Sequence, residues 1–237
     1  MSLSMPIEMK TTTFKIYNKP TSIYAENAFN KPKDCSSNYS LYYFEIKYKV
    51  KEEKNLDNSR SIYIGLKNSK NNYVKLSITG KTIYFNLQNK LENNGYVNLD
   101  KVVLKNNDIV GCGLVYPPSS DNRPYIFFTH NGKQIGKTIL MNDTCDDYKP
   151  YIEFKCFSVE TNFGKDLKAN PFAFDFSKHK FHKYSNFEKD LNELIEMFPM
   201  ITKEGLKQLL LAKGGIKEIV LNKLLQIFPK ANWSINN

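Results

Sequence analysis

The sequence predicts a mainly β protein, in which an antiparallel β-sandwich is followed by a small bundle of three helices. Aromatic residues make up 14% of the 237 residues, with 15 Tyr and 16 Phe, and this composition favours strands. From about residue 10 to residue 178, short alternating segments are separated by turn residues. After residue 183 apolar residues recur at the spacing of a helix. We therefore expect a first domain at 10–178, a linker at 179–185 and a second domain at 186–230.

The first domain contains ten segments with the composition of strands. They are rich in β-branched and aromatic residues and are bounded by Gly, Pro, Asn and Asp. They cover residues 41–50, 61–68, 73–79, 81–87, 101–104, 108–116, 125–130, 134–140, 151–163 and 171–176. Strands at this spacing, with turn chemistry between them, are typical of an antiparallel sandwich.

The segment FFTHNGKQIGKT at 127–138 allows two interpretations. Its end resembles a phosphate-binding loop, which needs four residues between its first Gly and a Gly-Lys-Ser/Thr. Only three residues separate Gly132 from Gly136, and no helical pattern follows Lys137. Asn131-Gly132, in contrast, is a dipeptide that tolerates the positive φ angles of a two-residue hairpin loop. The segment therefore predicts a β-hairpin and does not indicate an NTPase.

Three helices are predicted in the second domain. Ser185 and Glu188 form a capping box, in which each side chain satisfies a backbone N–H at the helix start. Pro199 ends the first helix, and Gly214-Gly215 can end the second by supplying a left-handed residue. The helices are expected over residues 186–198, 203–213 and 216–228. Because the linker is short, we expect the two domains to pack together.

The third helix carries more apolar residues than one buried face needs. A core stripe near the helical period is formed by Ile216, Ile219, Val220 and Leu224. Leu221 and Leu225 fall on a neighbouring face. A unit of about 45 residues buries only a modest part of its surface, so we expect Leu221, Leu225 and Met197 to be exposed. An exposed apolar patch on a small domain indicates a partner surface, although these residues could also pack on the sandwich.

The net charge of +10 raises the question of nucleic acid. Lys is interspersed with Asp and Glu along the whole chain, and Arg occurs only at Arg60 and Arg123. This distribution disfavours a nucleic-acid-binding protein, which would need a basic face. No apolar run reaches the length of a membrane span, and the N-terminus lacks the blocks of a signal peptide. We therefore expect a cytoplasmic protein, with the nucleus as the alternative.

Residues that could hold a metal or carry out catalysis do not form a recognisable pattern. The cysteines form no CxxC pair, and Cys112 and Cys156 lie in apolar strand-like runs typical of buried thiols. His179 and His182 lack a third ligand at a sensible spacing, and His130 precedes the hairpin turn, where a lone His is structural. No Ser-His-Asp or Cys-His arrangement stands in a catalytic motif. We predict no metal, no cofactor and no enzymatic activity.

Seven segments of the strand series carry a family resemblance. They are Tyr42–Ile46 (YYFEI), Ile62–Leu66 (IYIGL), Gly80–Tyr84 (GKTIY), Asp108–Leu114 (DIVGCGL), Ile126–Gly136 (IFFTHNGKQIG), Tyr148–Ile152 (YKPYI) and Thr161–Gly164 (TNFG). In these segments the chain resembles the SPRY domain, a B30.2-related β-sandwich that serves as a protein-interaction module. Asn107 departs from the Gly that the family commonly has before its DVVGCGL strand. Within the family, the chain is most similar to Ran-binding-protein-M-like and fungal endosomal-adaptor proteins of eukaryotes. The resemblance implies a protein ligand bound by loops, such as the loop at 116–123.

The second domain carries two short motifs, Met197-Phe198-Pro199 at the end of the first helix and Leu224-Leu225 in the third. In these motifs it resembles the CUE domain, a UBA-related three-helix module that binds ubiquitin. It implies that Met197, Pro199 and Leu225 contact ubiquitin. Phe198 and Leu224 would be shared between the core and the contact, and Leu221 lies beside them.

Together, the two resemblances predict a non-enzymatic adaptor that binds a protein target through the sandwich and ubiquitin, or a ubiquitin-like protein, through the helices. The alternative is a scaffold or regulatory subunit that docks on a large assembly, such as a proteasome, an E3 ligase complex or a ribosome, without binding ubiquitin. An RNA-binding protein is a third class.

Overall fold

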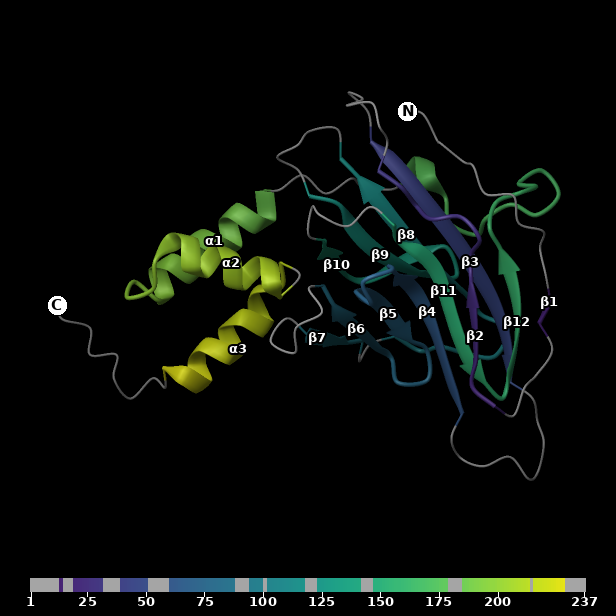
Figure 1. Ribbon diagram of the computed structural model, residues 1–237, viewed down its shortest axis with the longest axis horizontal. Helices are drawn as coiled ribbons and strands as arrows, with labels where there is room; N and C mark the ends of the chain where they lie inside the picture. The colour runs from purple at the N-terminus through teal and green to yellow at the C-terminus, as the bar shows by residue number, and fades with distance from the viewer. Residues whose placement is uncertain are drawn as a thin grey trace.

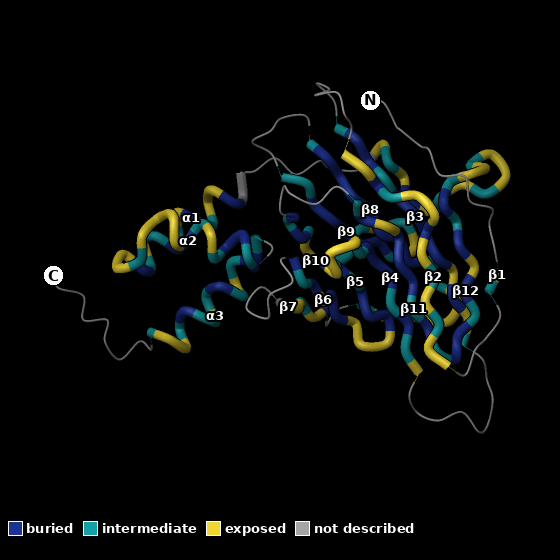
Figure 2. The backbone as a smooth tube through the Cα atoms, viewed as in Figure 1, coloured by how far each residue is buried: buried dark blue, intermediate teal, exposed yellow. Residues whose placement is uncertain are grey.

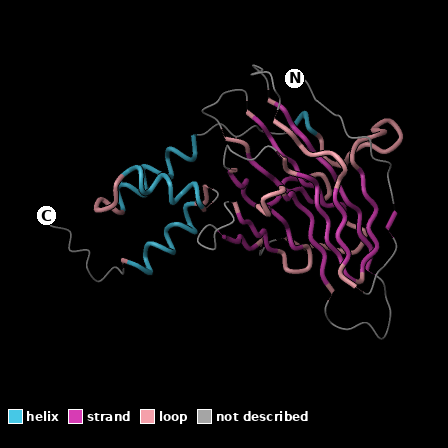
Figure 3. Tube along the Cα trace, viewed as in Figure 1, coloured by secondary structure: helices cyan, strands magenta, loops and turns pink. Residues whose placement is uncertain are grey.

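A computed structural model describes the chain at residues 13–14, 19–31, 39–50, 60–87, 94–99, 102–117, 123–141, 147–178, 185–213 and 215–228. It confirms the predicted fold class, because two antiparallel sheets stack on one another and three helices lie beside them (Figure 1). The strands and the three α-helices occupy separate parts of the molecule, as Figure 3 shows. Within the described residues, no helix has the length and apolar character needed to span a membrane.

Each sheet contains six strands, and every strand pairing is antiparallel. The order in the first sheet is β1 (Thr13–Phe14), β12 (Phe157–Asn162), β3 (Ser40–Val50), β8 (Ile109–Tyr116), β9 (Tyr125–His130) and β10 (Lys133–Leu140). The order in the second sheet is β2 (Thr21–Tyr24), β11 (Lys149–Lys155), β4 (Ser61–Lys67), β5 (Tyr73–Ser77), β6 (Thr82–Asn86) and β7 (Asn94–Asn98).

The main core lies between the two sheets. Successive side chains of a strand point to opposite faces, so the even-numbered residues of β3, such as Phe44 and Ile46, enter this core. Ile64 of β4 and Phe128 of β9 do the same, and all four residues are fully buried. Buried and less buried positions alternate along β2 and along the first residues of β4 and β5, whereas β8 and β9 are buried along nearly their whole length (Figure 2). Burying each such side chain contributes about 1.5–3 kcal/mol to folding, so this layer supplies most of the stability of the sandwich.

The predicted strand at 151–163 is wrong as a single element. It is two strands, β11 and β12, which belong to different sheets and meet at Cys156. Cys156 has a φ of 64°, which is left-handed backbone and breaks the extended run. The strand composition on both sides of Cys156 is continuous, so the sequence pattern alone does not mark the crossing.

Two further strand predictions are wrong, and strands β1, β2 and β7 were not predicted. Residues 102–104 form no strand, although residues 101–104 were expected to do so, and Lys101 lies outside the described residues. The second sheet instead ends with the unexpected strand β7, whose Gly and Asn content gives a weak strand signal. Residues 171–176 also form no strand. They run as a loop into a short 3-10 helix at Phe176–Lys178.

The β9–β10 hairpin confirms the interpretation of the Asn-Gly dipeptide. His130 pairs with Lys133, so that Asn131 and Gly132 form a two-residue loop. Their φ angles are 46° and 75°, which only Gly and a few residues such as Asn adopt readily. A tight hairpin loop of this kind leaves no room for a phosphate-binding turn.

The helices are α1 (Ser185–Met197), α2 (Lys203–Ala212) and α3 (Lys217–Ile227). The side chain of Thr202 accepts a hydrogen bond from the Gly205 N–H at 3.1 Å and caps the start of α2. Gly215 has a φ of 75° and donates to the Leu210 carbonyl at 2.8 Å, which is the predicted left-handed ending of α2. Gly214 and the Ser185 side chain of the predicted capping box lie outside the described residues.

Candidate functional site

The three helices enclose a small core of their own. Its buried residues are Phe187, Leu191, Leu194, Phe198, Leu206, Leu210, Leu211, Val220 and Leu224. The predicted core stripe of α3 is partly wrong, because only Val220 and Leu224 enter this core. Ile216 is 4% exposed and belongs to the core of the sandwich, and Ile219 packs against that same core. The start of α3 therefore packs on the sandwich, and we call this contact the anchor at Ile216.

Strand β10 provides the other side of this contact. The Leu140 side chain packs against the helical core, and a Cβ placed on Gly215 would lie 2.5 Å from Leu140 Cδ1. Lys137 Nζ and Glu218 Oε1 form an ion pair at 2.6 Å. The hydrogen bond from Lys137 lowers the pKa of Glu218, and partial burial opposes this shift. These contacts agree with the expectation that the helices pack against the sandwich, whereas residues 179–184 of the linker lie outside the described part.

The predicted ubiquitin-contact residues differ in their accessibility. Phe198 is 0% exposed and Leu224 is 3% exposed, so both belong to the helical core. Met197, Leu221 and Leu225 are half-buried and pack against that core from outside. Pro199 is exposed. The accessible part of the predicted site is therefore Met197, Pro199, Leu221 and Leu225, with Phe198 and Leu224 beneath it.

The two predicted motifs meet at one end of the helical unit. The rings of Phe198 and Phe228 have centroids 6.5 Å apart, which joins the turn after α1 to the end of α3. This end points away from the sandwich in Figure 1. Met200 is 59% exposed in the same turn and was missed from the sequence, although its place directly after Pro199 was a usable signal. We call Met197, Pro199, Met200 and Leu225 the tip patch.

A second apolar site lies on the outer face of the first sheet. Residues 171–178, which we call the strap, cross this face. Phe174 of the strap is 7% exposed, with its ring centroid 5.3 Å from that of Tyr43 and 5.5 Å from that of Phe127. A Cβ on Gly113 would lie 2.3 Å from the Phe127 ring, so glycine is needed there for the ring to lie flat on β8. The strap thus closes a cluster of aromatic side chains.

Glu45 holds the strap in place. Its carboxylate accepts hydrogen bonds from the backbone N–H groups of Ala173 at 2.9 Å and Phe174 at 3.1 Å, and from the Tyr43 hydroxyl at 2.8 Å. Thr129 Oγ1 lies 2.6 Å from that hydroxyl. Burial raises the pKa of Glu45, although the three hydrogen bonds to the carboxylate oppose the rise. The buried acid therefore has a structural task, which is to pair two strap amides.

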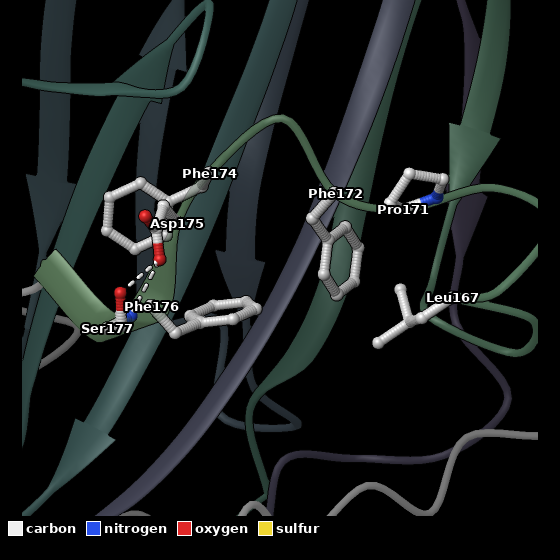
Figure 4. Close-up of a pocket in the computed structure, with 7 residues that line it drawn as sticks. All are labelled: Leu167, Pro171, Phe172, Phe174, Asp175, Phe176 and Ser177. Atoms are coloured by element: carbon white, nitrogen blue, oxygen red, sulfur yellow. Dashed lines mark hydrogen bonds between the residues drawn. The ribbon is translucent and has the colours of Figure 1, made fainter.

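The strap also lines an open hollow of about 330 Å³ (Figure 4). The rings of Phe172 and Phe176 stand 5.6 Å apart along it, and Asp175 accepts hydrogen bonds from the backbone and hydroxyl of Ser177. The residues that line the hollow are Leu167, Pro171, Phe172, Phe174, Asp175, Phe176 and Ser177. Among these lining residues Asp175 has the one carboxylate, and it is hydrogen-bonded to Ser177. The lining therefore suits contact with an apolar group.

His130 belongs to a local network at the hairpin. Its Nε2 lies 2.7 Å from Asp108 Oδ2, and Asn131 Nδ2 donates to Asp108 Oδ1 at 2.9 Å. Burial opposes ionisation of Asp108, but hydrogen bonds from Asn131, the Lys105 N–H and His130 outweigh it and lower the pKa of this carboxyl. The network ties the hairpin to the turn before β8, as expected for a structural histidine.

No group of three or more metal-ligating side chains occurs among the residues that the structure describes. Cys112 and Cys156 are buried thiols, as predicted. His179, His182 and residues 118–122 of the expected ligand loop lie outside the described residues, as do Cys35 and Cys145.

Comparison with known proteins gives only similarities of fold. No family model matches the sequence, and no curated protein matches it. The fold is similar to that of a human SPRY domain, with a TM-score of 0.42 and 18% identity, over 68% of this chain and 97% of that domain. It is also similar to the carbohydrate recognition domain of Emp47p, with a TM-score of 0.38 and 11% identity, over 61% of this chain and 76% of that one.

A fructofuranosidase from Schwanniomyces occidentalis is similar at a TM-score of 0.36 and 13% identity, over 65% of this chain. This chain spans 33% of the fructofuranosidase. Identities and TM-scores this low assign neither a family nor an activity. The structure itself defines the class of protein, which is a two-sheet antiparallel β-sandwich with a docked three-helix unit.

Proposed function

We propose that the protein is a non-enzymatic adaptor with a SPRY-like domain at 10–178, a linker at 179–185 and a CUE-like domain at 186–230. The CUE-like domain would bind ubiquitin or a ubiquitin-like protein, and the SPRY-like domain would bind a separate protein target. One observation carries the proposal: the tip patch leaves apolar side chains at the end of the helical unit that faces away from the sandwich.

The position of the tip patch supports a partner surface. The first turn of α3 makes the anchor at Ile216 and the ion pair at Glu218, whereas Leu221 and Leu225 follow one and two turns later. Docking on the sandwich therefore leaves the far end of α3 accessible. Phe198 and Leu224 support the patch from beneath as core residues. A small apolar patch of this kind complements the apolar face of ubiquitin and should bind weakly, with a Kd of roughly 100 μM.

The test is an NMR titration of ¹⁵N-labelled ubiquitin with the full chain. We expect shifts on the apolar face of ubiquitin, and we expect Met200→Asp and Leu225→Asp each to weaken binding by roughly tenfold or more, because a charge would be placed in an apolar contact. Met200 is 59% exposed, so its substitution should leave the fold intact.

Ile227→Asp is the matched control. Ile227 is 57% exposed and lies two residues after Leu225, which places it on the opposite side of α3. The Ile227→Asp variant should unfold at the same temperature as the wild type and should bind ubiquitin as the wild type does. If ubiquitin shows no shifts with a folded chain, or if Ile227→Asp weakens binding as much as Met200→Asp does, the ubiquitin proposal is wrong.

One observation favours the alternative of a scaffold subunit. The anchor at Ile216 and the Lys137–Glu218 ion pair join the helices to the sandwich. A protein that holds its two units in this way can present one continuous surface to a large assembly. Under this alternative the tip patch would bind a component of the assembly, and ubiquitin would not bind.

A further inference from the structure

The outer face of the second sheet has an unusual composition. The inward positions of its strands carry the aliphatic and Phe side chains of the core. Among the described outward positions of these six strands, no Leu, Ile, Val, Met or Phe occurs. Tyrosines occupy six of the outward positions, namely Tyr24, Tyr63, Tyr73, Tyr84, Tyr96 and Tyr151. The other outward positions are mostly Lys, Ser, Thr and Asn, with one carboxylate, Glu153.

Strand register aligns four of these tyrosines in one row across the sheet. Tyr24 pairs with Tyr151, which pairs with Gly65. Gly65 pairs with Lys75, Lys75 with Tyr84, and Tyr84 with Tyr96. The row is therefore Tyr24, Tyr151, Gly65, Lys75, Tyr84 and Tyr96. With strands about 4.8 Å apart, it extends over about 24 Å.

The tyrosines at the two ends of the row are accessible. Tyr96 is 61% exposed, Tyr24 is 46% exposed and Tyr84 is 38% exposed. Tyr151 is covered by its neighbours, with the Tyr24 ring centroid 5.1 Å from its own. Tyrosines on an exposed sheet face without aliphatic neighbours offer flat rings for stacking, and their hydroxyl groups remain hydrated.

Positive charge lies among the rings. Lys75 Nζ is 4.3 Å from the Tyr63 ring centroid and 5.4 Å from that of Tyr73, and Lys67 Nζ is 5.9 Å from that of Tyr151. Burial, together with the charge of Lys67, lowers the pKa of Lys75, while Glu153 at 3.8 Å opposes the shift. Lys149 and Lys155 occupy further outward positions of β11. Among the described outward positions of the strands, four lysines against one glutamate give a net charge of +3.

We propose that this face binds single-stranded nucleic acid. The face offers a partner for both parts of a single-stranded nucleic acid. Its bases can stack on the tyrosine rings, and its phosphates can pair with the lysines. A neutral glycan would not complement the net positive charge of these positions, and a typical protein interface would include aliphatic residues at its centre. Sequence analysis disfavoured nucleic acid because lysines are spread along the chain. The sheet brings Lys67, Lys75, Lys149 and Lys155 onto one face, and the face is distinct from the tip patch.

The experiment measures fluorescence anisotropy of labelled oligouridylate and oligothymidylate, each of about twelve nucleotides, with the full chain at about 50 mM salt. Both strands should bind, and the pair distinguishes RNA from DNA as the preferred form. Contact with about three phosphates predicts that the logarithm of the affinity falls with the logarithm of salt concentration with a slope of about −2. A duplex of the same length should compete poorly, because its bases are already stacked.

Two sets of variants separate stacking from general charge. Tyr84→Ala and Tyr96→Ala should each weaken binding by roughly tenfold, whereas Tyr84→Phe and Tyr96→Phe retain the ring and should bind as the wild type does. Lys67→Ala with Lys75→Ala should weaken binding more than Lys189→Ala with Lys203→Ala, which removes the same charge from exposed positions of α1 and α2.

The proposal fails if neither strand binds at low salt. It also fails if the Ala variants at Tyr84 and Tyr96 bind as the wild type does, or if both lysine pairs have equal effects, because charge alone would then explain the binding. Thermal unfolding of every variant identifies any loss that comes from the fold.

Discussion

The outer faces of the two sheets are built from the same kind of alternating strand, but one face is covered by another segment of the chain and the other is exposed to solvent. On the first sheet, Leu41, Tyr43, Val115, Tyr125 and Phe127 point outward, and the strap covers them. On the second sheet, Tyr24, Tyr84 and Tyr96 remain exposed to solvent. Tyr occurs on both faces, so the difference lies in Leu41, Val115 and Phe127, which have no counterpart on the second sheet. Leu, Val and Phe have no polar group to hydrate and need a cover, whereas Tyr and Lys keep a polar end in water.

The comparison also shows that a covered face requires its own polar support. The strap contributes backbone N–H groups at Ala173 and Phe174, and these need acceptors once they are buried. Glu45 supplies the acceptors from the sheet below. On the open face, Tyr24, Tyr84 and Tyr96 meet water, and no strap amide needs a buried acceptor among the described residues.

The largest effect on stability is expected from removing the Phe174 ring, which covers the first sheet. Phe174→Ala should lower the free energy of unfolding by about 3–5 kcal/mol, because it empties a buried site between Tyr43 and Phe127. Tyr96→Ala on the open face should change it by no more than about 0.5 kcal/mol, since Tyr96 is 61% exposed. Urea unfolding of the two variants measures the difference. Equal losses would show that the two faces are not distinguished by burial.

A smaller effect is expected from the titration of Glu45. Its pKa is raised in the folded protein, so the folded state binds more protons than the unfolded state as pH rises from the ordinary value of 4.5 to the raised one. The stability that Glu45 contributes is complete below pH 4.5 and is lost as pH rises through the raised pKa.

Glu45→Gln removes this titration. The stability of the wild type minus that of Glu45→Gln should therefore fall as pH rises from 4.5 through the raised pKa, by about 1.4 kcal/mol for each unit by which the pKa is raised. Urea unfolding across this pH range measures the difference. A difference that stays constant or grows with pH would contradict the raised pKa.

The smallest effect is expected where the helices meet β10. Lys137 and Glu218 are each 57% exposed, so Lys137→Ala should cost no more than about 0.5–1 kcal/mol, and the loss should shrink at high salt. A double-mutant cycle with Glu218→Ala measures the coupling between the two residues. A coupling that is unchanged at high salt would show that the pair is shielded from solvent. The pair would then resemble the covered face of the first sheet and not the open face of the second.

Sequence determined the local structure wherever one residue dictates the backbone. Asn131-Gly132 specified the hairpin, Pro199 ended α1 and Gly215 ended α2, because each requirement acts over a few neighbouring residues. Spacing along the third helix found Leu221 and Leu225, the resemblance to the CUE domain pointed to Met197 and Pro199, and Met200 was missed.

Only the tertiary structure decided how distant segments combine. The crossing at Cys156, the entry of Ile216 into the sandwich core and the strap over Phe127 all depend on contacts between residues far apart in the chain. The tyrosine row depends on the register of six strands, and a shift of one residue in any strand would turn its tyrosine to the other face. Register is set by the packing of the whole sandwich, so no local pattern contains it.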